Sequence, residues 1–449
     1  MRLFKPRPTL TQLPAIPLVP EAVLTLHSAA EFRAELLRRI AAAGHRIYLC
    51  SLYLQNDEAG AEVLHALHAA KTARPALEIA VLVDWHRAQR GLIGASEHSG
   101  NAGWYRELAA ARDSVVPIYG VPVQTRELFG VLHLKGFVID DTVIYSGASL
   151  NNVYLHKQEK YRHDRYLLLR NSVLADCMVE FTRRHILAAP AVHRLDQAGP
   201  PATRSIRGDI RRFREQLKRA RYSFSLPHDH AAAGGLCVTP LVGVGKSNPL
   251  NRAICSLLAA SRQQITICTP YFNLPPAVTR ELNRALQRGV QIDIIVGDKT
   301  ANDFFIPPEQ DFKIIGALPY LYEVNLRRFA RKHQAAIASG QLNLHLWKEG
   351  ENSYHLKGLW IDSHYSLMTG NNLNPRAFRL DLENALLIHD PQQQLASQRR
   401  TELAGILRDT TVLTGYQSLQ QLADYPPPVR KLLSRLSRTR LDLLAYRVL

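Results

Sequence analysis

One short motif occurs twice in this chain and constrains its fold more than any other feature. The first copy is His133-Leu-Lys-Gly-Phe-Val-Ile-Asp140 and the second is His355-Leu-Lys-Gly-Leu-Trp-Ile-Asp362. Both fit H-x-K-x4-D, and they also share the Leu between His and Lys, the Gly after Lys and the Ile before Asp. A single match to three specified positions arises easily by chance, whereas two such extended copies do not. The duplication predicts one active site built from two similar halves.

The spacing within the motif indicates which side chains face a ligand. In an extended strand, residues two apart lie on the same face, so the His and the Lys of each copy point together. The Asp falls on the other face or at the end of the strand, where it supports the turn that follows. The motif residues expected in the active site are His133, Lys135, His355 and Lys357, with Asp140 and Asp362 as their supports.

A histidine beside a lysine is well suited to phosphoryl chemistry. The lysine stabilises oxyanion charge, while the imidazole attacks phosphorus or transfers a proton. A protonated lysine has no lone pair for a metal ion, and neither motif holds other His, Cys or carboxylate residues at zinc spacing. We therefore expect a phosphoryl-transfer site that uses neither a metal ion nor another cofactor.

The similarity between the halves extends upstream of the motif. The matched strand-like segments are 47–54 with 265–272 and 77–84 with 291–298, and the helical patterns between them span 60–71 and 276–288. Strand, helix, strand and then the His-Lys strand make an α/β unit whose strands are buried on both faces. The chain is predicted to contain two pseudo-symmetric α/β domains, each a mixed sheet flanked by helices, with the active site at their interface.

The similarity also extends downstream. A G-x-x-L-N element follows each motif, at 147–151 and at 370–374, and an acidic residue then leads into an apolar run. These acidic residues are Asp164 and Glu383, and we expect each to fix the tautomer of a catalytic imidazole through Nδ1. The alternative for Asp164 is a surface ion pair with Arg162 or Arg165.

Length and composition predict two to three domains, because 449 residues with 46% hydrophobic content can bury large cores. The predicted units are an N-terminal domain of 1–195, a basic linker and helix of 196–235, a C-terminal domain of 236–425 and a basic amphipathic segment of 426–449. The five cysteines form no CxxC pair, which favours buried thiols in a reducing compartment. No apolar run approaches the roughly 18 residues that span a bilayer, and the first residues lack the apolar core of a signal peptide. We expect a cytoplasmic protein.

The net charge of +17 implies an anionic partner, either nucleic acid or an anionic membrane surface. Much of the charge lies in three segments, 204–221, 326–333 and 430–447. The last combines Arg and Lys with a Leu-rich stripe, a composition typical of an interfacial helix on acidic lipid. The aromatic segments 304–308 and 318–322 either enter a membrane or pack in the core, and the helix of 204–221 either packs across the halves or is simply solvated.

The paired motifs resemble those of the phospholipase D superfamily, and the flanking sequence is similar to its bacterial phosphatidylserine synthase branch over nearly the whole chain. The segments that carry this resemblance are Leu82-Val-Asp-Trp-His-Arg-Ala-Gln-Arg-Gly91, Tyr145-Ser-Gly-Ala-Ser-Leu-Asn151, Val238-Thr-Pro-Leu-Val-Gly243, Ile267-Cys-Thr-Pro-Tyr-Phe-Asn-Leu-Pro275, Gly297-Asp-Lys-Thr-Ala-Asn-Asp-Phe304 and Thr369-Gly-Asn-Asn-Leu-Asn-Pro-Arg376. One departure is that the superfamily's G-S/T-x-N places Asn three residues after Gly, whereas here Asn follows four residues after. The phosphate contact is therefore open among Ser149, Asn151, Asn372 and Asn374.

The resemblance implies transfer of the phosphatidyl group from CDP-diacylglycerol to L-serine, giving phosphatidylserine and CMP. One histidine attacks phosphorus to form a phosphatidyl-histidine, while the other protonates the departing CMP and later deprotonates the serine hydroxyl. By analogy His133 is the nucleophile and His355 the acid/base, although the pseudo-symmetry leaves the reverse open. The lysines, with nearby Ser or Asn side chains, hold the non-bridging oxygens. The enzyme would work peripherally at the inner face of the cell membrane.

Three cations follow the matched strands that end at Asp84 and Asp298, where ligands gather in open α/β sheets. They are Arg87, Arg90 and Lys299, which meet pyrophosphate or cytidine or else are ordinary surface charges. Rival functions are a cardiolipin synthase-like transferase, a nuclease and an idle membrane scaffold. The intact motifs argue against the scaffold, and the flanking segments argue against the nuclease, so no specific nucleic acid partner is expected. No motif specifies an oligomeric state.

Overall fold

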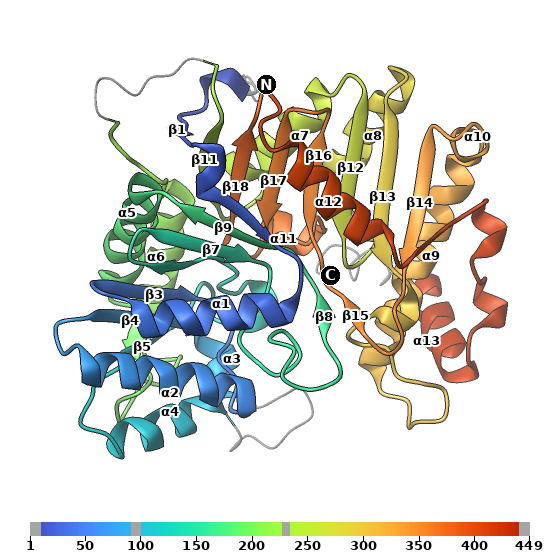
Figure 1. Ribbon diagram of the computed structural model, residues 1–449. Helices are drawn as coiled ribbons and strands as arrows, with labels where there is room; N and C mark the ends of the chain where they lie inside the picture. The colour runs from blue at the N-terminus through green and yellow to red at the C-terminus, as the bar shows by residue number, and fades with distance from the viewer. Residues whose placement is uncertain (1–9, 91–99, 227–233, 440–449) are drawn as a thin grey trace.

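The computed structural model describes residues 10–90, 100–226 and 234–439. Two large mixed sheets lie next to each other, and helices pack on their faces (Figure 1). The predicted α/β class, with two duplicated units, is confirmed.

The first sheet has eight strands in the order β10-β5-β4-β3-β6-β7-β9-β2. Its strands are β2 (Val23–Leu26), β3 (Arg46–Cys50), β4 (Glu78–Asp84), β5 (Ile118–Val121), β6 (Phe137–Ile139), β7 (Thr142–Ser146), β9 (Tyr166–Arg170) and β10 (His193–Arg194). Strands β3, β4 and β5 run parallel, and the other pairs are antiparallel. The first motif therefore enters the sheet through β6, next to the central strand β3.

The second sheet repeats this order strand for strand. From β19 to β11 it runs β19-β14-β13-β12-β16-β17-β18-β11, and β1 adds one more strand at the far edge. Its strands are β1 (Ile16–Pro17), β11 (Cys237–Gly243), β12 (Gln264–Thr269), β13 (Gln291–Gly297), β14 (Leu342–Trp347), β16 (Gly358–Ile361), β17 (Tyr365–Thr369), β18 (Glu383–His389) and β19 (Thr410–Val412). The edge strand β1 precedes every strand of the first sheet, so the N-terminal segment crosses to the second.

Equivalent helices cover the two sheets. The two predicted helices are confirmed as α2 (Glu58–Ala73) and α8 (Pro276–Gln287), and they pack against α1 (Ala29–Ala42) and α7 (Pro249–Ala260). Helix α1 begins where the Ser28 hydroxyl accepts the backbone N–H of Glu31, and it buries Phe32, Leu36 and Ile40 at helical spacing. The other helices are α3 (Trp85–Gln89), α4 (Asn101–Ala110), α5 (Ser172–Phe181), α6 (Arg207–Arg219), α9 (Leu318–Lys332), α10 (Gln334–Ala338), α11 (Pro375–Arg379), α12 (Ala396–Leu407) and α13 (Pro427–Arg438).

The His and Lys of each motif lie just before the sheet strand, not within it as predicted. Strand β6 begins at Phe137 and β16 begins at Gly358, both after the motif lysine. The preceding segments are bound by the other half of the chain instead of by a neighbouring strand of their own sheet. Residue Leu132 forms a parallel bridge with Leu382, and the short strands β8 (Arg162–His163) and β15 (Ser353–Tyr354) pair in parallel.

The two halves share a continuous interior. The main hydrophobic cluster contains first-half residues such as Leu132 and Tyr145 together with Met368 and Leu386 of the second. In Figure 1, β8 and β15 lie side by side between the two sheets. Both histidine motifs run into this junction.

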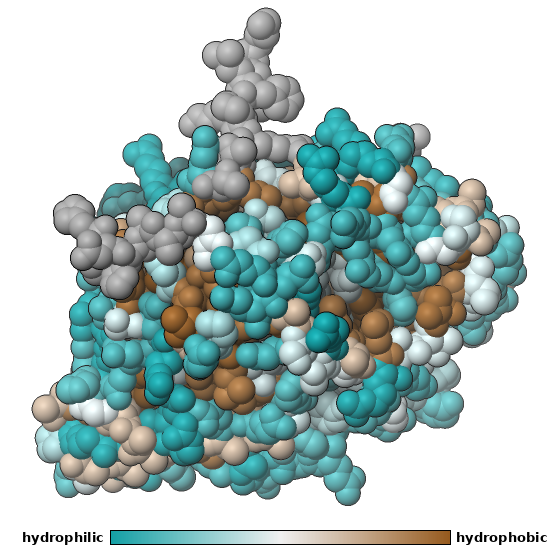
Figure 2. Space-filling model, turned by 45° about the horizontal axis from the view of Figure 1, so that its top comes forward, coloured by the Kyte–Doolittle hydropathy of each residue, from teal (hydrophilic) through white to brown (hydrophobic). Residues whose placement is uncertain are grey.

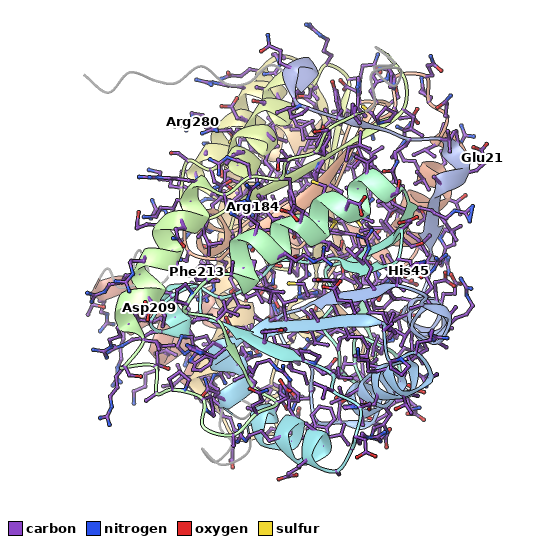
Figure 3. The ribbon with its side chains drawn as sticks, turned by 90° about the vertical axis from the view of Figure 1, so that its left-hand side faces the viewer. Glu21, His45, Arg184, Asp209, Phe213 and Arg280 are labelled. Carbon is purple, nitrogen blue, oxygen red and sulfur yellow. The ribbon has the colours of Figure 1, made fainter. Side chains whose placement is uncertain are left out.

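The predicted basic helix forms as α6 within the segment 204–221. It buries Ile210, Phe213 and Leu217, while most of its cations face solvent. Figure 3 labels Asp209 and Phe213 on this helix, which lies beside the turn that contains Arg184. The Arg214 guanidinium donates to the carbonyls of Val123 and Leu380 at 3.3 and 3.1 Å, so α6 contacts both halves.

The C-terminal basic helix also forms, as α13, but part of its apolar stripe is used inside the protein. Val429 and Leu433 are buried in a cluster with Tyr320 and Tyr425, so this part of the stripe packs against the rest of the protein. Segment 318–322 opens α9 and buries Tyr320 and Tyr322, so there the core alternative holds. The predicted contributions of 440–447 lie outside the described residues. Among the described helices, none combines the length and the apolar character needed to cross a bilayer.

The motif aspartates act as supports, but the backbone they bind leads into the neighbouring strands β3 and β12 and is not the turn that follows their own strand. The Asp140 carboxylate accepts the backbone N–H groups of Gly44, His45 and Arg46 at 2.9, 2.8 and 3.1 Å. Asp362 accepts those of 262–264 in the same way. Both aspartates adopt positive φ, 49° and 50°. Neither carboxylate contacts a motif histidine or lysine, so their part is structural.

Replacing Asp140 with Ala should lower the free energy of unfolding by about 1–3 kcal/mol, because three backbone N–H groups lose their acceptor. Denaturant unfolding measures this loss, and Asp141→Ala next to it is the matched control, since its carboxylate makes only long or exposed ion pairs. A selective loss of turnover with unchanged stability would contradict the structural role.

Candidate active site

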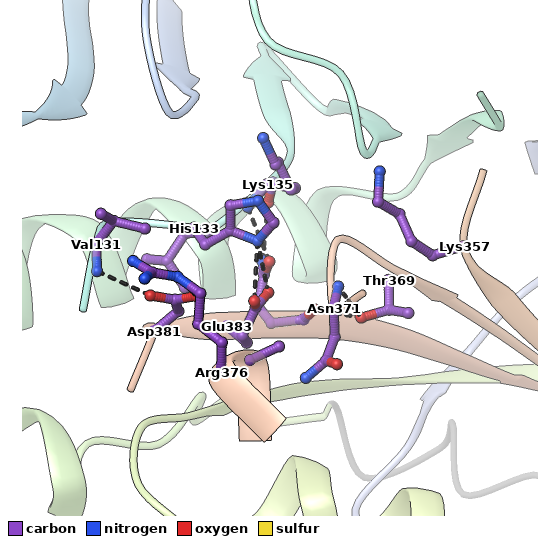
Figure 4. Close-up of polar contacts among 12 residues, drawn as sticks. Val131, His133, Lys135, Lys357, Thr369, Asn371, Arg376, Asp381 and Glu383 are labelled. Atoms are coloured by element: carbon purple, nitrogen blue, oxygen red, sulfur yellow. Dashed lines mark hydrogen bonds and ion pairs between the residues drawn. The ribbon is translucent and has the colours of Figure 1, made fainter. Parts of the chain in front are cut away.

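His133 is held by a carboxylate from the second half of the chain. Its Nδ1 lies 2.9 Å from Glu383, the first residue of β18 (Figure 4). Its backbone N–H donates to the carbonyl of Leu382 at 3.0 Å, which fixes the residue beside that strand. Within the described residues, Nε2 of His133 has no hydrogen-bond partner. That nitrogen is therefore available to react.

His355 is held in the complementary way by the first half. Its Nδ1 lies 2.8 Å from Asp164, and its backbone N–H donates to the carbonyl of His163 at 2.9 Å. Here Nε2 is engaged, because the Tyr154 hydroxyl lies 2.9 Å away and the Lys357 ammonium 3.0 Å away. The predicted carboxylate partners are thus present, but each comes from the opposite half, which the sequence did not indicate. Asp164 is buried, so the surface ion pair considered for it is wrong.

Both motif lysines are buried beside the histidines. The Lys135 ammonium donates to the carbonyl of Ala148 at 3.2 Å and lies 3.5 Å from the Ser149 hydroxyl. Lys357 lies 3.5 Å from Asp164 and also contacts the backbone carbonyl of His355. The close-up in Figure 4 shows both lysines near His133. Two buried cations near one imidazole create an electrostatic environment that favours an anion.

The first glycine of each G-x-x-L-N element makes room for a lysine of the opposite half. A Cβ on Gly147 would lie 2.9 Å from the Lys357 nitrogen, and a Cβ on Gly370 would lie 2.7 Å from Cγ of Lys135. Only glycine permits this approach without displacing the lysine. The element thus serves the site partly through its first residue.

The polar residues later in the two G-x-x-L-N elements differ in whether their side chains are used in local turns. Asn151 accepts the backbone N–H of Tyr154 at 3.0 Å, and Asn374 accepts that of Ala377 at 2.8 Å as the N-cap of α11. Their carbonyl oxygens therefore organise local turns. Ser149 lies beside Lys135, and the buried Asn372 side-chain oxygen has no hydrogen-bond partner in the described structure. The Ser149 hydroxyl, which lies beside Lys135 and can donate a hydrogen bond, is the best placed of the four candidates for a phosphate contact.

The three cations predicted to meet pyrophosphate or cytidine are partly engaged with the protein. Arg90 donates to Glu127 at 2.7 Å, and Lys299 donates to Glu323 at 3.0 Å and to Gln420 at 2.6 Å. Arg87 lies 5.3 Å from the Tyr53 ring centre. The ring centres of Tyr53 and Tyr154 are 6.5 Å apart, and Tyr154 contacts His355, so Arg87 is linked to the site through these two rings.

Burial keeps both imidazoles neutral. It lowers the pKa of His133 well below 6.5, and the charges of Lys135 and Lys357 lower that pKa further. Burial and the Lys357 charge lower the pKa of His355 to about 4, against the opposing effect of Asp164. Burial also lowers the pKa of each lysine to about 8, so both remain mainly charged at neutral pH.

The two carboxylates differ in their ionisation. Burial raises the pKa of Glu383 well above its usual value, and the neighbouring Asp381 raises that pKa further. Burial would also raise the pKa of Asp164, but Lys357 and His355 outweigh it and hold that pKa at about 2. The pseudo-symmetric site is therefore electrostatically asymmetric.

Comparison with known proteins identifies the family. Residues 254–406 match the family model described as cardiolipin synthase, PLD-like domain. The chain is 53% identical over 441 residues to the CDP-diacylglycerol–serine O-phosphatidyltransferase of Escherichia coli K12, an alignment that covers 98% of this chain and 97% of that protein. The corresponding Haemophilus influenzae enzyme is 49% identical over 444 residues, with the same coverage of both chains. This chain belongs to the CDP-diacylglycerol–serine O-phosphatidyltransferase family.

A solved structure agrees with this membership. The crystal structure of phosphatidylserine synthase from Haemophilus influenzae Rd KW20 superposes with a TM-score of 0.94 at 49% identity and covers 98% of each chain. The likeness thus extends over the whole two-sheet fold of this family member, both motifs included.

Sequence reasoning missed two site residues of this phosphatidyltransferase family member. Tyr154 contacts His355, and the Asn384 side chain bridges the halves by accepting the Lys135 N–H and donating to the Lys135 carbonyl, both at 2.8 Å. Asn384 directly follows Glu383, so its position was a usable signal. Tyr154 stands in only one half of the duplication, so comparing the repeats could not reveal it.

The imidazole pKa values should respond in opposite directions to two substitutions. Lys135→Met should raise the pKa of His133 by removing a nearby positive charge, whereas Asp164→Asn should lower that of His355 by removing a negative one. Titration of histidine-labelled protein by nitrogen NMR measures both, with His→Ala variants to assign the signals. An imidazole that is charged at pH 7 in the parent protein would contradict the site electrostatics.

Proposed function

We propose that this protein transfers the phosphatidyl group of CDP-diacylglycerol to the hydroxyl of L-serine, releasing CMP. The observation that carries the proposal is the pair of carboxylate-oriented histidines, His133 and His355, buried with two lysines at the junction of the halves. Family membership supplies the substrates, since relatives of this similarity over the whole chain are named for this reaction.

In the first step, His133 acts as the nucleophile. When the Nδ1 proton is donated to an ionised Glu383, Nε2 carries no proton and can attack the phosphorus that bears diacylglycerol. A bond forms between Nε2 and phosphorus while the bond from phosphorus to the CMP oxygen breaks. The leaving oxygen belongs to a phosphate whose second pKa is about 6, so it needs little help from a proton. The charges of Lys135 and Lys357 stabilise the non-bridging oxygens.

In the second step, His355 acts as the base. Its imidazole is neutral, and Asp164 fixes Nδ1 and stabilises the imidazolium that forms. The serine hydroxyl gives its proton to Nε2 of His355 as its oxygen attacks the phosphatidyl-histidine. The bond to His133 then breaks, which frees its Nε2. The proton on His355 passes to solvent, and the enzyme returns to its starting state. The open Nε2 of His133 supports its assignment as the nucleophile.

The test is an assay of CMP release from CDP-diacylglycerol in mixed micelles, with and without L-serine, together with identification of the lipid product. Serine-dependent formation of phosphatidylserine is expected. Hydrolysis alone, transfer only to another phospholipid, or activity only on DNA would replace the proposal with a phospholipase, a cardiolipin synthase-like enzyme or a nuclease, respectively.

Replacing each histidine with alanine should block a different step of the reaction. His133→Ala should abolish labelled phosphatidyl-enzyme after an acid quench, whereas His355→Ala should still form it but release it slowly, because the base for the second step is missing. Both variants should lose overall turnover by a factor of at least about 100. Covalent labelling that survives in His133→Ala and vanishes in His355→Ala would reverse the two roles.

We further propose that the protein binds peripherally to anionic membrane at the cytoplasmic face. Helices α9 and α13 support this, because both expose cations. A cavity of about 240 Å³ lies between them, lined by Arg328 and Arg331 of α9 and by apolar residues of α13. The exposed cations are Arg328, Arg331, Lys332, Arg430, Lys431, Arg435 and Arg438. Figure 2 shows a face that is mainly hydrophilic, with hydrophobic residues in separate patches. The exposed cations of α9 and α13 favour binding through attraction to anionic lipid.

Charge reversal on this surface should weaken binding to vesicles that contain anionic phospholipid. Each cation near such a surface contributes about 1 kcal/mol, so Arg328→Glu with Arg331→Glu should lower the partition coefficient at least tenfold. Flotation at two salt concentrations measures it, and Arg112→Glu with Arg170→Glu, both exposed on the first half, is the control. An equal loss in both double variants would indicate a net-charge effect without a defined docking surface.

A further inference from the structure

Arg162 lies at the junction of the halves, close to the second motif. It is the first residue of β8, which pairs in parallel with β15, and its partner in register is Ser353. Ser353 stands two residues before His355, so the pairing brings Arg162 next to the proposed base of the second step. Its side chain is 20% exposed, which gives a small ligand access to it.

The guanidinium is held rigidly from two sides. Its central carbon lies 4.6 Å from the ring centre of Tyr154, and its Nε lies 2.9 Å from Asp303. The Asp303 carboxylate also accepts the Tyr271 hydroxyl at 3.1 Å and is only 8% exposed. An arginine fixed in this way loses little conformational entropy when it binds an anion.

The two outer nitrogens of this guanidinium are unused. Among the described residues, neither Nη1 nor Nη2 of Arg162 has a hydrogen-bond partner, although the residue is ion-paired through Nε. Two parallel N–H donors of this kind match the two oxygens of a carboxylate or a phosphate. Arg162 is stacked, oriented and located beside the catalytic histidine, and its two outer nitrogens can still donate hydrogen bonds. It is therefore a candidate binding site for an anionic group.

The site lies on the side of His355 where the acceptor alcohol has to bind. Tyr154, over which Arg162 is stacked, contacts Nε2 of His355, the nitrogen that takes the acceptor's proton. In serine, the hydroxyl and the carboxylate are attached to adjacent carbons, so a hydroxyl that reaches His355 carries its carboxylate close by. In the proposed mechanism, Lys135 and Lys357 bind the non-bridging oxygens of the reacting phosphate. The outer nitrogens of Arg162 therefore remain for a different anionic group.

We propose that Arg162 selects serine by binding its carboxylate through Nη1 and Nη2, with Asp303 as the residue that positions the guanidinium. This rests on the proposed transferase function and names the group that recognises its acceptor. A carboxylate and a phosphate both present two oxygens that this guanidinium can bind. The diphosphate of CDP-diacylglycerol is therefore the alternative ligand. Selection through the carboxylate also gives serine an advantage over water.

The experiment compares Arg162→Lys and Arg162→Gln with the parent enzyme and with Lys160→Gln, an exposed cation two residues away. The apparent KM for serine should rise about tenfold or more in both Arg162 variants, since even lysine lacks the bidentate fork, and transfer should fall relative to hydrolysis of CDP-diacylglycerol. Asp303→Asn should raise the KM for serine with a smaller change in kcat. Thermal unfolding checks that each variant is folded.

The outcomes separate the two anion sources. If the KM for CDP-diacylglycerol rises and hydrolysis falls together with transfer, the fork binds diphosphate and the inference is overturned. If the KM for serine stays within twofold of the parent in folded variants, the inference is also overturned. As a second readout, the preference for serine over ethanolamine, which lacks a carboxylate, should shrink in Arg162→Gln. If the parent enzyme shows no serine-dependent release of CMP, the proposed function itself is contradicted.

Discussion

Each motif imidazole is oriented by a carboxylate from the opposite half of the chain, and the rest of the site depends on this crossed pairing. His133 binds Glu383 and His355 binds Asp164, both in the buried junction. Isolated ionised groups at such depth would be costly, and they are tolerated because each is paired. Neither half can therefore present a properly oriented histidine alone. Docking of the two sheets is what creates the active site.

Backbone hydrogen bonds also hold each motif histidine against the opposite half of the chain. The His133 N–H donates to Leu382, and the His355 N–H donates to His163, in each case next to the partner carboxylate. The motif histidine and its carboxylate are consequently held by neighbouring backbone bonds, so the side-chain contact is preorganised. Such preorganisation lowers the cost of reaching the reactive geometry.

The duplicated halves have diverged in their electrostatics. The Asp164 carboxylate is stabilised by Lys357, which keeps its pKa low, whereas burial and Asp381 raise the pKa of Glu383. Tyr154 occupies Nε2 of one imidazole only. Two chemically different steps require two different histidines, and these unequal surroundings supply the difference within a symmetric frame.

The sequence by itself determined the duplicated α/β units, the histidine and lysine pairs and the two carboxylates, because strand and helix periodicity and a repeated motif are local signals. It misjudged the extent of the motif strands, since this depends on what packs against them. Only the tertiary structure decided that Asp164 serves His355 and Glu383 serves His133. The half that supplies each carboxylate depends on how distant segments dock against each other. Tyr154 has no counterpart in the second repeat, so comparing the repeats does not reveal it.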